Sequence, residues 1–179
     1  MSERAAASQA TGPVIICYDG SDQAAAAIPA VANLMPGARA VVVTAWKPIV
    51  EALLTVSVAP TPLISDPAAA DERQRQAAEA LARDGARRAS QAGLDAEPLA
   101  VEASGAMWKA IEAVARDRDA RAIACGRRGQ GVESSLPGSV ATALVHNSSR
   151  PVLVVPSAER PPRRRERRSR RRVPLITRR

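Results

Sequence analysis

Glycines cluster between two short apolar runs near the end of the chain. An apolar run, 122–125, stops at Gly126, and Gly129, Gly131 and Gly138 follow before a helical pattern begins around Ser139. Glycine lets backbone N–H groups approach a ligand closely, and a helix start adds unpaired N–H groups and a partial positive charge. Together these features predict a phosphate-binding segment. The alternative is a tight turn followed by a helix cap, since an isolated glycine motif is a weak signal.

A second polar group, Asp19-Gly20-Ser21, follows the first apolar run. The carboxylate of Asp19 could accept hydrogen bonds from ribose hydroxyls or contact a metal, but this sequence also favours a turn or a helix cap. Arg127 and Arg128 could hold a phosphate through bidentate contacts or could face solvent. The residues alone leave both choices open.

Short apolar runs alternate with helical patterns along the chain. We expect strands over 14–18, 40–46, 98–103, 120–125 and 151–155, and helices over 22–35, 71–92, 106–116 and 138–147. Pro29 should kink the first helix or confine it to one side. The Pro-rich connection 47–67 is long enough to be functional or flexible. This alternation predicts a doubly wound parallel α/β sheet with helices on both faces, whose ligand site lies at the carboxyl ends of the strands.

Composition limits the class of protein. With 179 residues, no Phe, one Tyr and two Trp, we expect one domain with a Val, Leu, Ile and Ala core. Runs of about 18 apolar residues are absent from the sequence, so no membrane span is expected. We predict a disordered lead over 1–12, a folded domain over 13–157 and an Arg-rich disordered tail over 158–179, in a cytoplasmic protein.

The basic character of the chain resides in its tail. Residues 160–179 hold 11 of the 26 basic and 1 of the 18 acidic residues, which leaves 15 basic and 17 acidic residues elsewhere. Such a tail could bind nucleic acid through nonspecific phosphate contacts, although it lacks aromatic residues for base stacking. A solvated extension without a selected role is the alternative.

The segment from Pro13 to Pro156 resembles the universal stress protein family. The similarity rests on the strand ending in Asp19-Gly20-Ser21, the strand ending at Gly126, the glycine loop and the closing RPVLVV run. The nucleotide-binding members of that family carry glycine, two residues, glycine, nine residues, glycine and then Ser or Thr. Gly126, Gly129, Gly138 and Ser139 match this pattern, except that eight residues separate Gly129 from Gly138 and Pro137 precedes Gly138.

The resemblance implies a five-stranded parallel sheet of the adenine nucleotide alpha hydrolase-like type, commonly dimeric through the last strand. It implies ATP, possibly with Mg²⁺, as the ligand, with Asp19 on the adenosine, the region of Ala45 beside the adenine, and the loop glycines and Ser139 on the phosphates. The expected binding set is Cys17, Asp19, Ala45, Cys125, Gly126, Arg128, Gly129, Gly138, Ser139 and Val140. Because some members bind no nucleotide, a nucleotide-free dimeric interaction module is the alternative.

Residues suited to catalysis or metal binding are few. His146 is the only histidine, and Cys17 and Cys125 show no metal-ligand spacing. By analogy with the family the two cysteines should lie on adjacent strands, with inert buried thiols as the simplest interpretation. No catalytic group is predicted, so the expected role is regulatory binding, with slow ATP hydrolysis at most.

Overall fold

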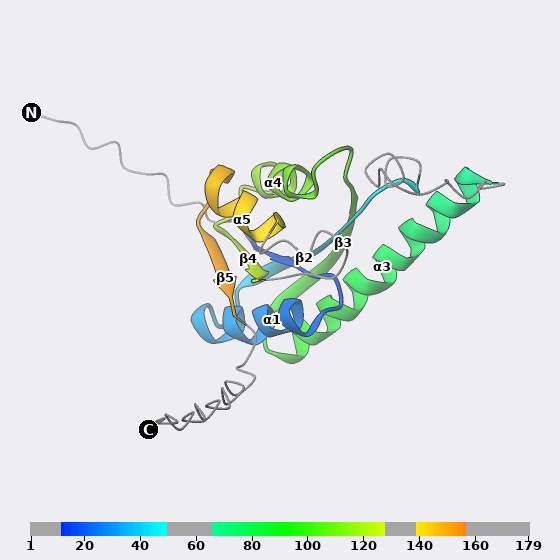
Figure 1. The fold of residues 1–179 in the computed structure, drawn as a ribbon. Helices are drawn as coiled ribbons and strands as arrows, with labels where there is room; N and C mark the ends of the chain where they lie inside the picture. The colour runs from blue at the N-terminus through cyan, green and yellow to red at the C-terminus, as the bar shows by residue number, and fades with distance from the viewer. Residues whose placement is uncertain (1–11, 50–65, 128–138, 157–179) are drawn as a thin grey trace, which may run out of the picture.

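The computed structural model describes residues 12–49, 66–127 and 139–156. In the described residues the chain forms five strands and four helices, labelled as in Figure 1. The strands are β1 (Val14–Cys17), β2 (Arg39–Trp46), β3 (Asp95–Glu102), β4 (Ala122–Gly126) and β5 (Val152–Val155). The helices are α1 (Asp22–Leu34), α3 (Pro67–Gln91), α4 (Met107–Asp117) and α5 (Ser139–Asn147).

All five strands join one parallel sheet in the order β3-β2-β1-β4-β5. The predicted doubly wound α/β sheet is therefore confirmed. The first strand, β1, lies at the centre of the sheet. Strands β2 and β3 follow on one side of β1, and β4 and β5 follow on the other side. The direction of winding thus reverses between β1 and β4, which is where open α/β sheets bind ligands.

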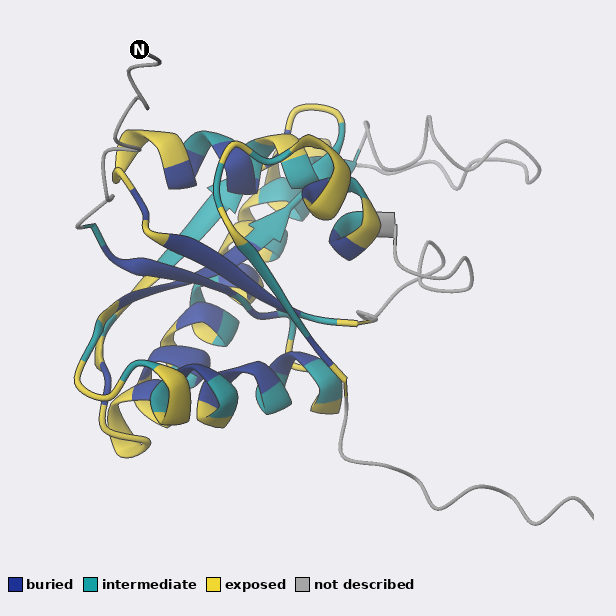
Figure 2. Ribbon diagram, turned by 90° about the vertical axis from the view of Figure 1, so that its left-hand side faces the viewer, coloured by how far each residue is buried: buried dark blue, intermediate teal, exposed yellow. Residues whose placement is uncertain are grey.

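Two helices cover each face of the sheet, and the two cores are aliphatic (Figures 1 and 2). On one face α1 and α3 pack against alternate strand residues, among them Val14, Ile16 and Val42. On the other face α4 and α5 pack against a second set that includes Ile15 and Ile123. Since both faces are buried, the central strands read as continuous apolar runs in the sequence.

Helix α1 continues through Pro29, which corrects the expectation that the proline would confine the helix to one side. Pro29 is exposed, so the backbone carbonyl that loses its N–H partner can turn toward water. Ala27, Ile28 and Val31 are buried against the sheet and hold the helix in place. Packing therefore outweighs the local cost of the proline.

Helix α3 starts four residues before the predicted boundary at residue 71. Asp66 accepts a hydrogen bond from the N–H of Ala69 at 3.0 Å, and Pro67 occupies the first turn. These two residues form a favourable helix start. The first 11 residues of the helix, 67–77, contain no buried residue, whereas the second half buries Ala78, Ala82 and Gly85 among others.

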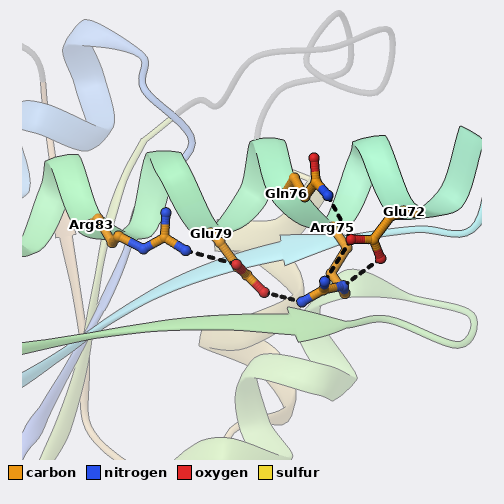
Figure 3. Close-up of polar contacts among 5 residues, drawn as sticks. All are labelled: Glu72, Arg75, Gln76, Glu79 and Arg83. Atoms are coloured by element: carbon orange, nitrogen blue, oxygen red, sulfur yellow. Dashed lines mark hydrogen bonds and ion pairs between the residues drawn. The ribbon is translucent and has the colours of Figure 1, made fainter.

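The exposed side of α3 carries charged side chains three or four residues apart. Figure 3 shows Glu72 and Glu79 on either side of Arg75, with Gln76 and Arg83 extending the row. All these pairs lie within one helix and in solvent, where each contributes little to stability. They favour the helical state of a segment that has few tertiary contacts.

Strand β3 begins at Asp95, three residues before the predicted start, and contains Pro98 opposite Val42 of β2. Strand β3 lies at the edge of the sheet and has a neighbouring strand on one side only. Proline, which has no backbone N–H, is tolerated on such an edge strand. The other predicted boundaries agree with the structure within two residues. Most of the predicted connection 47–67, and Gly138 at the expected start of the last helix, lie outside the described residues.

Candidate nucleotide site at the carboxyl edge of the sheet

The first candidate group, Asp19-Gly20-Ser21, joins β1 to α1 at the carboxyl edge. The carboxylate of Asp19 accepts a hydrogen bond from the N–H of Ser21 at 3.0 Å, and the hydroxyl of Ser21 accepts one from the N–H of Ala24 at 3.1 Å. Gly20 has a φ of +80°, a conformation that favours glycine. Asp19 thus organises the turn, as one of the two interpretations predicted. Whether it also contacts a ligand stays a prediction.

The first turn of α1 lies directly against the end of β4. A Cβ atom built on Gly126 would lie 2.6 Å from both the carbonyl carbon and the carbonyl oxygen of Gln23, and 2.9 Å from the backbone nitrogen of Ala24. Any side chain at position 126 would therefore push the helix away. Gly126 has a packing function of its own, and it brings the N-terminus of α1 to the point where the winding of the sheet reverses.

Tyr18 fixes the backbone that carries Asp19. Its N–H donates to the carbonyl of Val43 at 2.9 Å, and its carbonyl accepts a hydrogen bond from the buried hydroxyl of Thr44 at 2.8 Å. Its hydroxyl donates to Asp84 of α3 at 2.9 Å. The close approach of α3 requires Gly85, since a Cβ there would lie 2.8 Å from the Tyr18 ring. Tyr18 therefore ties β1, β2 and α3 together just before the turn.

The carboxylate of Asp84 has a pKa of about 2, lowered by hydrogen bonds from Arg88, Tyr18 and Arg87. We expect Tyr18→Phe to raise this pKa, because one donor to the ionised form is lost. The measurement is an NMR pH titration of the side-chain carboxyl carbons. A carboxylate whose pKa is lowered on folding stabilises the fold above its unfolded pKa. Stability from Asp84 should therefore be lost as the pH falls from about 4 toward 2.

Glu72 provides the control for this titration, since its partners Arg75 and Gln76 are on the same helix and Tyr18 does not contact it. Its resonance should titrate identically in both proteins. An unchanged pKa for Asp84 in Tyr18→Phe would contradict the assigned role of the tyrosine.

Cys17 and Cys125 end β1 and β4 on the face covered by α4 and α5. The strands pair in register from Val14 with Ala122 to Ile16 with Ala124, and Cys17 and Cys125 each follow the last paired residue of their strand. The expectation that they lie on adjacent strands is confirmed. Burial, followed by the nearby Cys125 and Asp19, raises the pKa of the Cys17 thiol. Burial raises the pKa of the Cys125 thiol to about 11. Both thiols are therefore protonated near neutral pH.

The universal stress protein family model matches residues 11–156 of this chain. The chain belongs to the universal stress protein family. None of the curated proteins matches the sequence.

Solved universal stress proteins share this fold at low sequence identity. One from Burkholderia pseudomallei is 24% identical, with a TM-score of 0.59 over 83% of this chain and 97% of its own. One in complex with cAMP is 22% identical, with a TM-score of 0.58 over 83% of this chain and 99% of its own. One from Archaeoglobus fulgidus in complex with dAMP is 19% identical, with a TM-score of 0.54 over 82% and 98%. At such identities the likeness shows the fold alone.

The other predicted binding residues of this universal stress protein divide into two groups. Ala45, near the end of β2, and Val140, in the first turn of α5, are half-buried and pack in the same apolar cluster as Cys125. Ser139 is the first residue of α5, while Arg128, Gly129 and Gly138 lie outside the described residues. The structure thus brings Cys17, Asp19, Cys125 and Gly126 to one edge, and their contacts with a ligand remain predictions.

Sequence analysis missed a buried carboxylate at the other end of the sheet. Glu112 of α4 is 8% exposed and accepts hydrogen bonds from the hydroxyl of Ser148 at 2.6 Å and from the N–H and hydroxyl of Ser149 at 3.0 and 2.7 Å. These bonds tie α4 to the segment between α5 and β5. The sequence offered one signal of this burial. Glu112 follows Ile111 directly and precedes Ala115 by three residues, and Ile111 and Ala115 are both buried on the same helix.

Two negative findings apply to residues 12–49, 66–127 and 139–156. No helix in these ranges has the length and apolar character needed to cross a bilayer. Nor do three or more His, Cys, Asp or Glu side chains in these ranges converge on a metal position.

Proposed function

We propose that this universal stress protein binds an adenine nucleotide, ATP in particular, at the carboxyl edge between β1 and β4. The observation that carries the proposal is the position of α1, whose first turn packs on Gly126 where the winding of the sheet reverses. Parallel α/β sheets bind ligands at this point, and a helix N-terminus favours an anion. Two structures of the same fold carry cAMP and dAMP, both adenine nucleotides.

Each binding residue has a proposed role. Asp19 would accept hydrogen bonds from the ribose hydroxyls, and Ala45 would border the adenine, with Cys17 and Cys125 below them on the sheet. The backbone N–H groups of the glycine segment, from Gly126 through Gly129 and Gly138 to Ser139 and Val140, would hold the phosphates. Arg128 would add a charged contact to a phosphate oxygen.

Unsatisfied hydrogen-bonding capacity at this edge supports a polar ligand. The side-chain oxygen of Gln23, in the first turn of α1, is buried and has no hydrogen-bond partner in the described part of the chain. A buried acceptor without a donor is costly, and a ligand N–H or O–H group could supply the missing bond. Mg²⁺ commonly binds through substrate phosphates with one or two carboxylates. The absence of a three-ligand cluster among the described residues is therefore compatible with a metal that arrives with the nucleotide.

The nucleotide would act as a regulatory signal in a cytoplasmic stress response. Its differential affinity for one conformation of the glycine segment would shift the protein toward that conformation. No residue is assigned as a general base, so turnover, if measurable, should be slow.

Asp19→Ala is expected to weaken ATP binding by about 10- to 100-fold, since a charge-assisted hydrogen bond contributes about 1.5 to 3 kcal/mol. Equilibrium dialysis with millimolar ATP, with and without Mg²⁺, measures the affinity. Asp95→Ala removes a carboxylate at the opposite end of the sheet and should leave binding unchanged. Ser21→Ala removes the helix cap alone and should lower stability more than affinity.

The proposal would be overturned by a folded wild-type protein that retains no ATP. A second variant, Gly138→Asp, places a negative charge among the proposed phosphate donors and should abolish binding. Equal affinity of wild type and Gly138→Asp would exclude the glycine segment as the phosphate site.

A nucleotide-free dimeric module is the second candidate. Strand β5 is an edge strand, and Val145 on the neighbouring helix α5 is 55% exposed. An open strand edge is a natural template for pairing with a second copy. A dimer in sedimentation analysis, together with no ATP uptake, would favour this candidate. Binding of nucleic acid by the Arg-rich tail, 158–179, remains a separate hypothesis because these residues lie outside the described ranges.

A further inference from the structure

The only two cysteines of the chain are brought together from positions 108 residues apart in sequence. Ile15 pairs with Ile123 in the β1–β4 register, and Cys17 and Cys125 each lie two residues further along the same face. Neighbouring strands are about 4.8 Å apart, so two thiols on the same face near the ends of adjacent strands can reach a common atom. Cys17 is half-buried and Cys125 is 3% exposed, so the pair lies just inside the carboxyl edge.

We propose that Cys17 and Cys125 form a two-coordinate site for a soft monovalent metal ion, Cu(I). Thiolates are soft ligands that suit Cu(I), zinc and iron–sulfur clusters, and iron–sulfur clusters are held by four cysteines, whereas this chain has two. Binding exchanges two S–H protons for two Cu–S bonds and gives a bis-thiolate complex of charge −1 with release of two protons. The oxidation state of copper and sulfur does not change.

The ligand set explains why a two-coordinate ion is the best match. Zinc in structural sites needs four ligands, and the described residues contain no group of three or more His, Cys, Asp or Glu around a common position. The chain has no third cysteine, and its single histidine, His146, is exposed near the end of α5. Among the described residues, the two thiols are therefore the ligands that the sheet offers at this position.

The surroundings protect the site without sealing it. Cys125 belongs to the apolar cluster formed with Leu144 and Ala141 of α5, and Val140 in the first turn of α5 packs against this cluster.

The test is an anaerobic titration of the full chain with Cu(I), without nucleotide, in competition with a chromogenic Cu(I) chelator. We expect one Cu(I) per chain and a sulfur-to-copper absorption band in the ultraviolet. Cys17→Ala and Cys125→Ala should each weaken binding by about 100-fold or more, since loss of a ligand costs at least as much as loss of a supporting contact. His146→Ala is the matched control and should bind as the wild type does.

If a cysteine variant fails to fold, X-ray absorption of the copper-loaded wild type identifies the atoms bound to copper. Two sulfur neighbours at one distance are expected, whereas a nitrogen or oxygen shell would overturn the proposal. Absence of Cu(I) uptake by the wild type, or unchanged uptake by a folded double alanine variant, would also overturn it. Since nucleotide is absent from every sample, these results are independent of the ATP proposal.

Discussion

Gly126→Ala is expected to lower the free energy of unfolding by about 3 kcal/mol, at the upper end of the usual cost of overpacking. The added methyl group would lie 2.6 Å from backbone atoms of Gln23, and backbone cannot rotate away as a flexible side chain can. Helix α1 would have to shift from the end of β4. Urea denaturation followed by circular dichroism measures the loss.

Gly37→Ala is the matched control for this substitution. Gly37 has a φ of +67°, but a Cβ atom at this position would have no neighbour within 4 Å, so alanine there introduces backbone strain without a clash. That strain should cost about 1 kcal/mol. If Gly126→Ala lowers the free energy of unfolding no more than Gly37→Ala does, α1 does not pack on Gly126 as described.

The same variant bears on ATP binding. ATP affinity, measured on the folded fraction, should fall together with stability if the position of α1 matters for binding.

Glu112→Ala is expected to cost about 3 kcal/mol at pH 7, because three hydrogen bonds to a buried carboxylate are lost and their donors remain. Burial opposes ionisation of Glu112, but the hydrogen bonds from Ser148 and Ser149, with Arg116 nearby, outweigh it and keep the pKa below its usual value. A lowered pKa in the folded state means that this stability is present above the unfolded pKa, near 4.5, and is lost as the pH falls below it.

Urea denaturation of wild type and Glu112→Ala at a series of pH values tests this prediction. The difference between the two should be largest near pH 7 and should shrink in acid. Glu72→Ala is the control, since Glu72 bonds only within the exposed row of Figure 3 and should change stability far less, with little pH dependence. A pH-independent difference for Glu112→Ala would mean that the ionised carboxylate is not what the serines stabilise.

Local patterns in the sequence were sufficient to predict the elements of this fold. The apolar runs that became β1, β2 and β4 are buried on both faces. The group Asp19-Gly20-Ser21, expected to form a turn or a helix cap, does so, and Ser21 is the residue that caps α1. Pro29 does not confine α1 to one side of it, because the cost of a proline is local, whereas the packing that offsets this cost comes from the sheet. The early start of α3 required recognition of Asp66 and Pro67 as a capping pair within a proline-rich segment.

The sequence predicted where the candidate site lies, but it did not predict the side chains that hold the site in position. The order of strands and turns pointed to the carboxyl edge, and Asp19 and Gly126 do lie there. The side chains that position this edge, Tyr18 and Thr44, carry no local signature, since their partners are set by strand register. Similarly, nothing near Gly126 in sequence reveals that its missing side chain makes room for α1.

Hydrophobic periodicity and helix capping act over a few residues, so the alternation of strands and helices, and hence a parallel α/β sheet, can be predicted from the amino-acid sequence. The contacts between distant residues depend instead on how the elements pack in three dimensions. Tyr18 reaches Asp84 across 66 positions and Ser148 reaches Glu112 across 36. Pairing of β1 with β4 brings Cys17 and Cys125 to the ends of neighbouring strands on one face of the sheet. Such contacts depend on strand order, register and close packing, which no short stretch of sequence encodes.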